Sequence, residues 1–433
     1  MITIHKHFHR KIIFRCIFFL FLLSSIFCFG QPENYMDKIY SSNIKSVQFF
    51  PKGWNFSNPV LLLGEEDQLL LRFDDLTEEI RNYNYQIVHC DFNWQPSGLL
   101  ESEYMTGFPE NEIFDYAQSI NTTVPYVNYQ LLIPNDNVQL KVSGNYALIV
   151  YQDHHSDQPI LVKRFYITEN KVNIKANVRR GTFDTYPGEK QEISFRIEHP
   201  DYPISDSHND IRVILRQNRF THNEITSLRP RFSKNGILDY DYNQENNFLG
   251  GNEFRYFDLK TIKTTGENVS NISFHRPYYH ATLMNDILRK GKPYYSYQDI
   301  NGQFLPYYQE HPETSDTEAD YIFVHFTFKI PKELAGGIHV YGELTNWTCN
   351  EESKMQWNPE QKHYELILLL KQGYYNYQYA YLPPNGTNPD LVEFEGSHFD
   401  TENDYHIFVY HTAPRSRYHR LISYRVVNSR KKN

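Results

Sequence analysis

The sequence predicts an all-β protein made of tandem β-sandwich domains with very little helix. Short apolar or alternating runs recur along the chain, and clusters of Gly, Pro and Asn separate them. Runs of this kind at this spacing are typical of sandwich strands. The chain also holds 35 Tyr and 30 Phe, and both residue types favour strands. Its 433 residues are enough for several compact domains.

The N-terminal residues 1–30 are predicted to be a signal peptide. Four basic residues precede an apolar run at residues 17–29, which is too short for a membrane-spanning helix. We expect Sec-dependent export and cleavage near Gly30. The bulky Phe27 before Cys28 argues against a lipoprotein cleavage site. The mature protein is therefore expected to be soluble and exported, without a lipid anchor.

The first domain is predicted to span residues 35–168. Its clearest strand signals are the apolar or alternating runs at residues 69–73, 85–89 and 129–133. Two further runs, at residues 145–151 and 160–167, flank a polar loop and are predicted to form a hairpin.

A middle domain is predicted over residues 170–310. A Pro187-Gly188 turn is followed by strict alternation of Ile193, Phe195 and Ile197, the period of a half-buried strand. Runs at residues 211–216 and 254–257 continue the strand pattern, and residues 277–290 are predicted to contain one or two helical turns. The polar, acidic stretch at residues 308–320 has no periodicity and is interpreted as a linker or long loop.

The C-terminal domain is predicted over residues 320–427. Residues 321–328 are apolar on both faces, which is typical of a central strand. Tyr375, Tyr377, Tyr379 and Tyr381 share one face of a later strand. This row is interpreted as the inner face of a sandwich, with an exposed adhesive sheet as the alternative.

Composition and cysteine content narrow the class of protein. The net charge is −9, and removal of the signal peptide would make the chain more acidic because the peptide holds only basic charges. This balance argues against nucleic acid as the main partner.

Only Cys90 and Cys349 lie outside the signal peptide, so they are either two isolated thiols or one bridge between domains.

No catalytic, metal or cofactor signature is found, so we expect a non-enzymatic protein without a cofactor. The sequence lacks the nucleophile elbow, the zinc-protease motif and the phosphate-binding glycine loop. Asp153, His154, His155 and Asp157 are the most metal-like cluster. They lie in the predicted hairpin loop, where polar residues are ordinary.

Residues 321–410 resemble the glycogen-binding modules of the early-set, immunoglobulin-like sandwiches. The stretch VYGELTNW ends at Trp347, which matches the first sugar-stacking tryptophan of that family. Gln378 stands where the family has a sugar-contacting lysine, Asn403 roughly matches a late asparagine, and the loop at residues 382–400 lacks the second tryptophan. The resemblance therefore implies a retained sandwich with a mostly lost sugar site.

The set of segments as a whole resembles the plug proteins of the type nine secretion system of Bacteroidota. Residues 40–76, 83–135 and 143–167 resemble the N-terminal domain of that family. Residues 299–304, 318–328 and 402–429 resemble the remainder. This resemblance implies a periplasmic protein that binds the outer-membrane β-barrel translocon and closes the periplasmic mouth of the barrel.

The residues that contact such a partner are predicted from aromatic side chains in loops. The candidates are the loop residues Trp54, Trp94 and Trp347. Turn-forming residues flank Trp54 and Trp94, and buried packing is the alternative for each of the three. A periplasmic or surface carbohydrate-binding protein is the alternative function.

Overall fold

The computed structural model describes residues 35–182, 188–242 and 244–430. Their regular structure is almost entirely β-strand, with a few helices of three or four residues. The all-β prediction is therefore confirmed. The predicted signal peptide and part of the Pro187-Gly188 turn lie outside the described residues. In the part of the chain that is described, no helix is long and apolar enough to cross a membrane.

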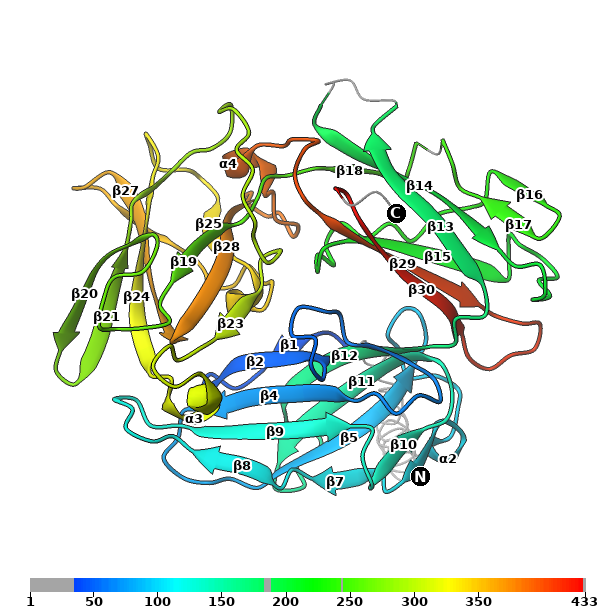
Figure 1. Cartoon of the computed structure of the whole chain (residues 1–433), viewed down its shortest axis with the longest axis horizontal. Coiled ribbons are helices and arrows are strands. Elements are labelled where there is room, and N and C mark those ends of the chain that lie inside the picture. Colours follow the sequence, from blue (N-terminus) through cyan, green and yellow to red (C-terminus); the bar gives the residue numbers. More distant parts are fainter. Residues whose placement is uncertain (1–34, 183–187, 243, 431–433) are drawn as a thin grey trace, which may run out of the picture. The chain divides into compact units, whose positions relative to one another are not determined.

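The strands form three lobes, each with its own apolar core (Figure 1). We call residues 35–169 the first lobe, residues 170–250 with 400–430 the second lobe, and residues 251–398 the third lobe.

The first lobe is a sandwich of two sheets with a core of alternating inward side chains, and all pairs in them are antiparallel except β3 with β12. One sheet has the order β1 (Lys38–Ile39), β12 (Pro159–Thr168), β11 (Gly144–Gln152), β5 (Tyr83–Cys90) and β7 (Glu110–Glu112), with β3 (Val60–Leu62) beside β12. The other has the order β2 (Ile44–Pro51), β4 (Leu69–Asp75), β9 (Val127–Ile133) and β8 (Asp115–Gln118). A small ribbon of β6 (Met105–Gly107) and β10 (Val138–Leu140) follows α2 (Glu101–Tyr104). The predicted hairpin is confirmed as β11 and β12, and the three predicted runs are β4, β5 and β9.

The second lobe is closed by the C-terminal end of the chain. Its first sheet contains β13 (Asn173–Arg180), β14 (Lys190–Glu198), β17 (Ile237–Asp239) and β16 (Phe232–Lys234), with β18 (Asn247–Leu249) beside β14. Its second sheet contains β15 (Ile211–Gln217), β29 (Asp404–His411) and β30 (Arg420–Asn428). Tyr405, Ile407 and Val409 of β29 pack into the same core as Ile193 and Phe195.

The third lobe draws strands from both of the segments expected as middle and C-terminal domains. One sheet has the order β20 (Val269–His275), β21 (Tyr278–Leu283), β24 (Tyr321–Lys329), β27 (His363–Lys371) and β26 (Gln356–Asn358), with β22 (Asp286–Ile287) beside β24. The other has the order β19 (Arg255–Asp258), β28 (Gly373–Leu382) and β23 (Phe304–Pro306), with β25 (Gly337–Tyr341) beside β28. The sheets therefore do not divide along the expected boundaries at residues 170–310 and 320–427.

Two local predictions about the third lobe have different outcomes. The row of Tyr375, Tyr377 and Tyr379 is buried in the core between the sheets, as the inner-face interpretation predicts. The helical turns predicted at residues 277–290 are wrong. This segment forms β21 and β22 because parallel pairing with β24 buries Ala281 and Leu283 at the two-residue period of a strand.

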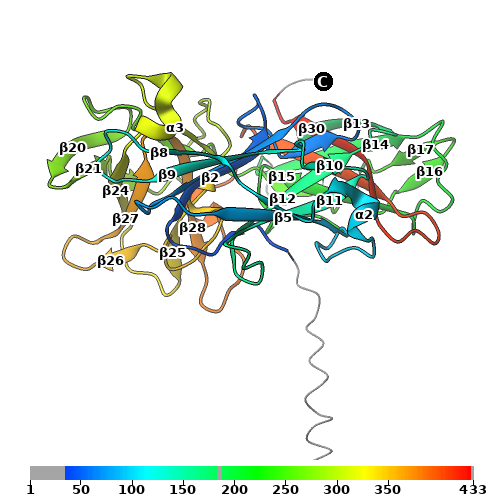
Figure 2. The ribbon, with the colours of Figure 1, turned by 90° about the horizontal axis from the view of Figure 1, so that it is seen from below.

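The stretch at residues 308–320, interpreted as a linker or loop, is an ordered connection to the first lobe. It contains η1 (Pro312–Thr314) and α3 (Ser315–Glu318). Figures 1 and 2 show α3 beside β9. Asp316 accepts hydrogen bonds from Arg72 Nη1 at 3.1 Å and from Gln130 Nε2 at 2.9 Å. The segment 308–320 is held by such polar contacts and not by one apolar face, so its sequence shows no hydrophobic periodicity.

A buried ion pair joins the first lobe to the third. Lys371 Nζ donates to Asp74 Oδ2 at 2.8 Å, and the two side chains are 2% and 0% exposed. Tyr321 and Asn128 also donate to the Asp74 carboxylate, at 2.7 Å each. The Lys371 ammonium also donates to the Asp316 carbonyl at 2.8 Å. Desolvation lowers the pKa of Lys371, and the Asp74 charge opposes that shift.

The contact between the first and second lobes is mainly apolar. The outer face of the β12–β11–β5 sheet packs on β15, β29 and β30. Arg216 is buried there and donates to the Tyr166 hydroxyl at 2.7 Å and to Glu224 Oε1 at 2.5 Å. Glu224 raises the pKa of Arg216 despite its burial, so the guanidinium remains charged inside this contact.

Replacement of Lys371 by Met should lower the free energy of unfolding by about 3–5 kcal/mol, because the Asp74 carboxylate would stay buried without its counter-charge. Urea titration followed by tryptophan fluorescence measures the change. The double variant Asp74→Asn with Lys371→Met should recover most of the loss. The exposed Lys332→Met should change stability by less than about 0.5 kcal/mol. Equal stability of the Lys371→Met variant and the native protein would contradict a structural role for the pair.

Candidate partner-binding surface

The loop at residues 52–59 of the first lobe is held by both other lobes. The Phe56 carbonyl accepts a hydrogen bond from Gln303 Nε2 of the third lobe at 3.2 Å. The Ser57 carbonyl accepts one from Arg219 Nη2 of the second lobe at 2.9 Å. Asn58 Nδ2 lies 3.1 Å from His406 Nδ1, also of the second lobe. These three contacts with two lobes hold the loop in place, although it has no regular secondary structure.

Local turn chemistry directs Trp54 out of this loop. Trp54 N–H donates to the Pro51 carbonyl at 2.8 Å, which closes a four-residue turn. Gly53 is the third residue of the turn and has a φ of +86°, a conformation that glycine adopts without steric cost. The Trp54 side chain is 70% exposed. An aromatic side chain this exposed on an anchored loop is a candidate contact for a protein partner.

A groove of about 450 Å³ lies beside Trp54, between the loop and the second lobe. Phe56 lines it from the first lobe, and His406, Tyr424 and Val426 line it from β29 and β30. Phe56 and Val426 are exposed. Trp54 is a candidate from the sequence alone. The placement of β29 and β30 beside it is not predictable from the sequence, because the pairing of β29 with β15 and the packing of both strands on the first lobe are tertiary contacts.

His406 joins this groove to the interior. Its Nδ1 lies 3.1 Å from Asn58 Nδ2 and 2.8 Å from the Tyr424 hydroxyl. Burial lowers the pKa of His406 to about 3, and the nearby Arg216 and Arg219 contribute to the shift. An amide nitrogen can only donate, so Nδ1 must accept and the imidazole is neutral.

Trp94, the second predicted contact, is placed differently. Its side chain is 6% exposed and packs in the apolar contact between the first and second lobes. Arg164 lies over the indole at 4.3 Å, and the Tyr166 ring is 5.2 Å away. Trp94 is therefore not available to a partner in this structure.

Trp347, the third predicted contact, is half-buried between the second and third lobes. Its ring meets those of Phe220, Tyr341 and Phe254 edge-on at 5.6, 5.8 and 6.2 Å. These contacts cover part of the indole, so less of it is open to stack on a flat sugar face.

The other two residues that matched sugar-contacting positions are also occupied. Gln378 is buried and donates to the Asn252 carbonyl at 2.7 Å. Asn403 is buried and donates to the Gly250 carbonyl at 2.8 Å. The resemblance to glycogen-binding modules therefore does not extend to an accessible sugar site at these positions.

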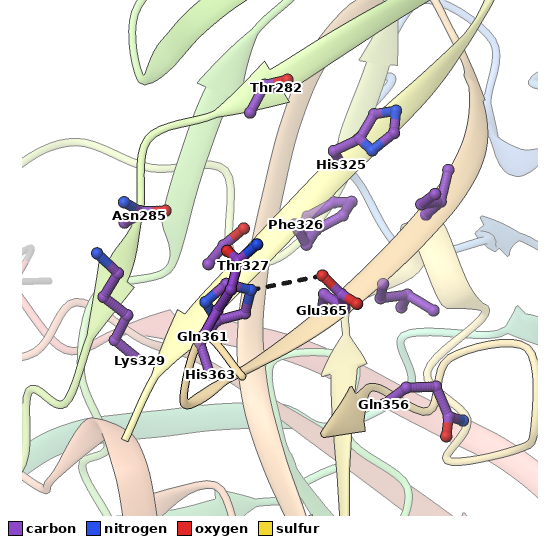
Figure 3. Close-up of a pocket in the computed structure, with 12 residues that line it drawn as sticks. Thr282, Asn285, His325, Phe326, Thr327, Lys329, Gln356, Gln361, His363 and Glu365 are labelled. Atoms are coloured by element: carbon purple, nitrogen blue, oxygen red, sulfur yellow. Dashed lines mark hydrogen bonds and ion pairs between the residues drawn. The ribbon is translucent and has the colours of Figure 1, made fainter. Parts of the chain in front are cut away.

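An open trough of about 680 Å³ lies on the outer face of the β24–β27 sheet (Figure 3). His325, Thr327 and Lys329 of β24 line it together with His363 and Glu365 of β27. His363 Nε2 lies 3.4 Å from Glu365 Oε2. The sequence pattern predicts a central strand with two apolar faces, and β24 is central in its sheet. The trough shows that its outward face is accessible.

The structure also places the metal-like cluster and the two cysteines outside the signal peptide. His154 of the metal-like cluster forms an ion pair with Glu110, which raises the pKa of His154. Among the described residues, no group of three or more His, Cys, Asp or Glu side chains is arranged to hold a metal ion. Cys90 and Cys349 are free thiols, and burial raises the pKa of each to about 12.

Comparison with known proteins identifies relatives over part and over nearly all of the chain. Residues 44–169 match the family described as the type 9 secretion system plug protein 1st domain. The crystal structure of a hypothetical protein from Parabacteroides merdae is 39% identical with a TM-score of 0.88, and the match covers 92% of this chain and 100% of that one. A trypsin-activated alpha-2-macroglobulin from Escherichia coli matches at 10% identity, over 87% of this chain and 26% of that one, with a TM-score of 0.19 that is too low to indicate a shared fold. No curated protein matches the chain.

The two first-lobe tryptophans should respond differently to truncation. Trp94→Ala should destabilise the protein by about 3–5 kcal/mol because it leaves a cavity between two lobes. Trp54→Ala should change stability by less than about 0.5 kcal/mol because the ring is exposed. Urea titration of both variants tests this. A large loss in Trp54→Ala would mean that Trp54 serves the fold and not a partner.

Acid should weaken the protein through His406. Its folded-state pKa lies below its ordinary value, so its contribution to stability is present above about pH 6.5 and is lost as the pH falls toward 3. Unfolding temperatures measured between pH 7 and 4 should fall less steeply for His406→Gln than for the native protein. The exposed His311→Gln should follow the native curve. Parallel curves for all three proteins would contradict the assignment.

Proposed function

The chain belongs to the same protein family as the Parabacteroides merdae protein, and we propose that it is a plug of the type nine secretion system. In this proposal it is a non-enzymatic protein that binds the outer-membrane β-barrel translocon and closes the periplasmic mouth of the barrel. The observation that carries the proposal is the match of residues 44–169 to the first domain of such plug proteins.

The contacts between lobes support a role as a physical barrier. A barrel wide enough for folded cargo encloses a water-filled lumen, so a plug must keep its shape across the opening. Buried polar contacts and an apolar interface join the first lobe to the other two. The described residues from 35 to 430 accordingly form one compact unit. Such a body blocks a channel without catalysis.

The family match implies a periplasmic location or one associated with the outer membrane. Export by the predicted signal peptide, with cleavage near Gly30, is the route we propose. The acidic net charge of −9 is compatible with a polar, reversible interface, which a plug needs if cargo is to displace it.

The loop at residues 52–59 is the proposed contact with the translocon. Trp54 supplies an exposed anchor, and the groove beside it offers an apolar surface from Phe56 and Val426. Trp347 and Trp94 have structural roles in this proposal, because both pack between lobes.

Purification of the tagged protein from solubilised outer membranes tests the proposed partner. The translocon barrel subunit, identified by mass spectrometry, should be recovered with the native protein. Trp54→Ala should reduce its recovery by about tenfold, a typical effect of removing a central aromatic anchor. The matched variant Tyr295→Ala removes another exposed aromatic ring and should have no effect.

Two outcomes would contradict the proposal. Failure to recover the barrel subunit after mild crosslinking would remove the proposed partner. Deletion of the gene should also make cells permeable to large antibiotics that the outer membrane normally excludes. Unchanged permeability would contradict closure of the barrel.

A further inference from the structure

The first lobe has an exposed sheet edge on the side opposite to the Trp54 loop. In its two sheets, β7 and β8 are the last strands, whereas β2 and β3, which flank the Trp54 loop, lie at the other side. Figure 1 shows β7 and β8 along the lower margin of this lobe. With neighbouring strands about 4.8 Å apart, three or four strand spacings separate the two surfaces, so both can be occupied at once.

The backbone of β8 can accept a further strand. Ser119 N–H donates to the Tyr126 carbonyl, and the same register pairs Ala117 with Asn128. Because hydrogen-bonded and non-hydrogen-bonded pairs alternate in an antiparallel ladder, the N–H and C=O groups of Tyr116 and Gln118 point away from β9. All residues of β8 are exposed. The edge therefore offers unpaired backbone groups to an incoming chain.

Large apolar side chains are concentrated along this edge. Phe108 and Phe114, which precede β7 and β8, are each 70% exposed. Tyr116 and Ile120 are exposed as well. A cluster of this kind on a soluble surface marks an interaction site.

The negative charge of the edge favours a partner with basic side chains. β7 and β8 hold three acidic residues, Glu110, Glu112 and Asp115, and no Lys or Arg. Glu110 also forms an ion pair with His154. The adjoining turn adds Glu78 and Glu79, and its Glu78 carbonyl accepts a hydrogen bond from Gln118 Nε2 at 3.5 Å. Aromatic rings next to carboxylates bind the side chains of Lys and Arg through cation–π and ionic contacts.

A second edge of the same protein provides a contrast. The edge strand β16 of the second lobe also has an exposed aromatic residue, Phe232, at 64%. There, however, Arg231 and Lys234 flank the ring. Positive charge on an edge is a common protection against strand addition. The β8 edge has no such protection.

We propose that the β7–β8 edge binds an extended, Lys- or Arg-bearing segment of a partner protein, which adds as a strand beside β8. The backbone N–H and C=O groups of Tyr116 and Gln118 form hydrogen bonds with the added strand. Its cationic side chains contact the Phe114 ring and form ion pairs with Glu112 and Asp115. This is a second binding surface, separate from the one proposed for the translocon. A plug with both surfaces can hold a further component while it occupies the barrel.

A labelled peptide of about ten residues in which lysine alternates with valine serves as the probe, since a strand of that length exceeds the edge. Fluorescence anisotropy should detect binding to the native protein that weakens as salt is added. The double variant Phe114→Ala, Tyr116→Ala should weaken binding by at least about tenfold, and so should Glu112→Lys with Asp115→Lys. Equal unfolding temperatures of the variants and the native protein establish that they are folded.

Matched controls separate this edge from other surfaces. Phe232→Ala should leave peptide binding unchanged, and so should Trp54→Ala, even if the translocon contact itself proves wrong. A peptide with methylated backbone nitrogens at alternate residues should not bind, because it cannot form the ladder, and replacement of its lysines by glutamate should also abolish binding. The proposal would be overturned by unchanged binding in the Phe114→Ala, Tyr116→Ala variant, by equal loss in Phe232→Ala, or by equal binding of the methylated peptide.

Discussion

The buried ion pair between Asp74 and Lys371 is the constraint on which the arrangement of this protein depends. Both groups are almost completely removed from water, and an isolated charge in such a place costs several kcal/mol. The two sheets that carry them must therefore meet in one register, since any shift would leave a charge without its partner. Tyr321, Asn128 and the Asp316 carbonyl complete the hydrogen bonding. The first lobe is thereby fixed to the third, and the segment containing α3 is fixed with it.

The chain path adds a second constraint. It leaves the second lobe after residue 250, builds the whole third lobe, and returns as β29 and β30 to complete the sheet with β15. The second lobe cannot close its core until the last strands are in place, because Tyr405, Ile407 and Val409 are part of that core. Asn403 and Gln378 are used in buried hydrogen bonds to Gly250 and Asn252, which hold together distant segments of the second lobe and of the third lobe. A sandwich that resembles a sugar-binding module therefore offers no sugar site there.

These constraints create surfaces with different roles. At one side of the first lobe, hydrogen bonds from the other lobes hold the Trp54 loop, and the Trp54 side chain remains exposed. At the opposite side, β7 and β8 end their sheets with exposed aromatic rings and acidic side chains. Both surfaces derive from the same sandwich, whose core combines aliphatic and aromatic side chains. The tyrosine and phenylalanine side chains pack largely in the cores. Of the rings that are exposed, those of Trp54, Phe56, Phe114 and Tyr116 lie at the two proposed surfaces.

The sequence by itself determined the fold class, most strands, the β11–β12 hairpin and the inward row of tyrosines, because the two-residue period and turn residues are local signals. It also identified Trp54, whose exposure follows from a local glycine turn. Only the tertiary structure decided that Trp94 and Trp347 pack between lobes, that residues 278–287 form strands, and that β29 and β30 close the second lobe. Those outcomes depend on pairing between residues far apart in the chain. Burial of a charge such as Lys371 likewise depends on its distant partner, which local periodicity cannot reveal.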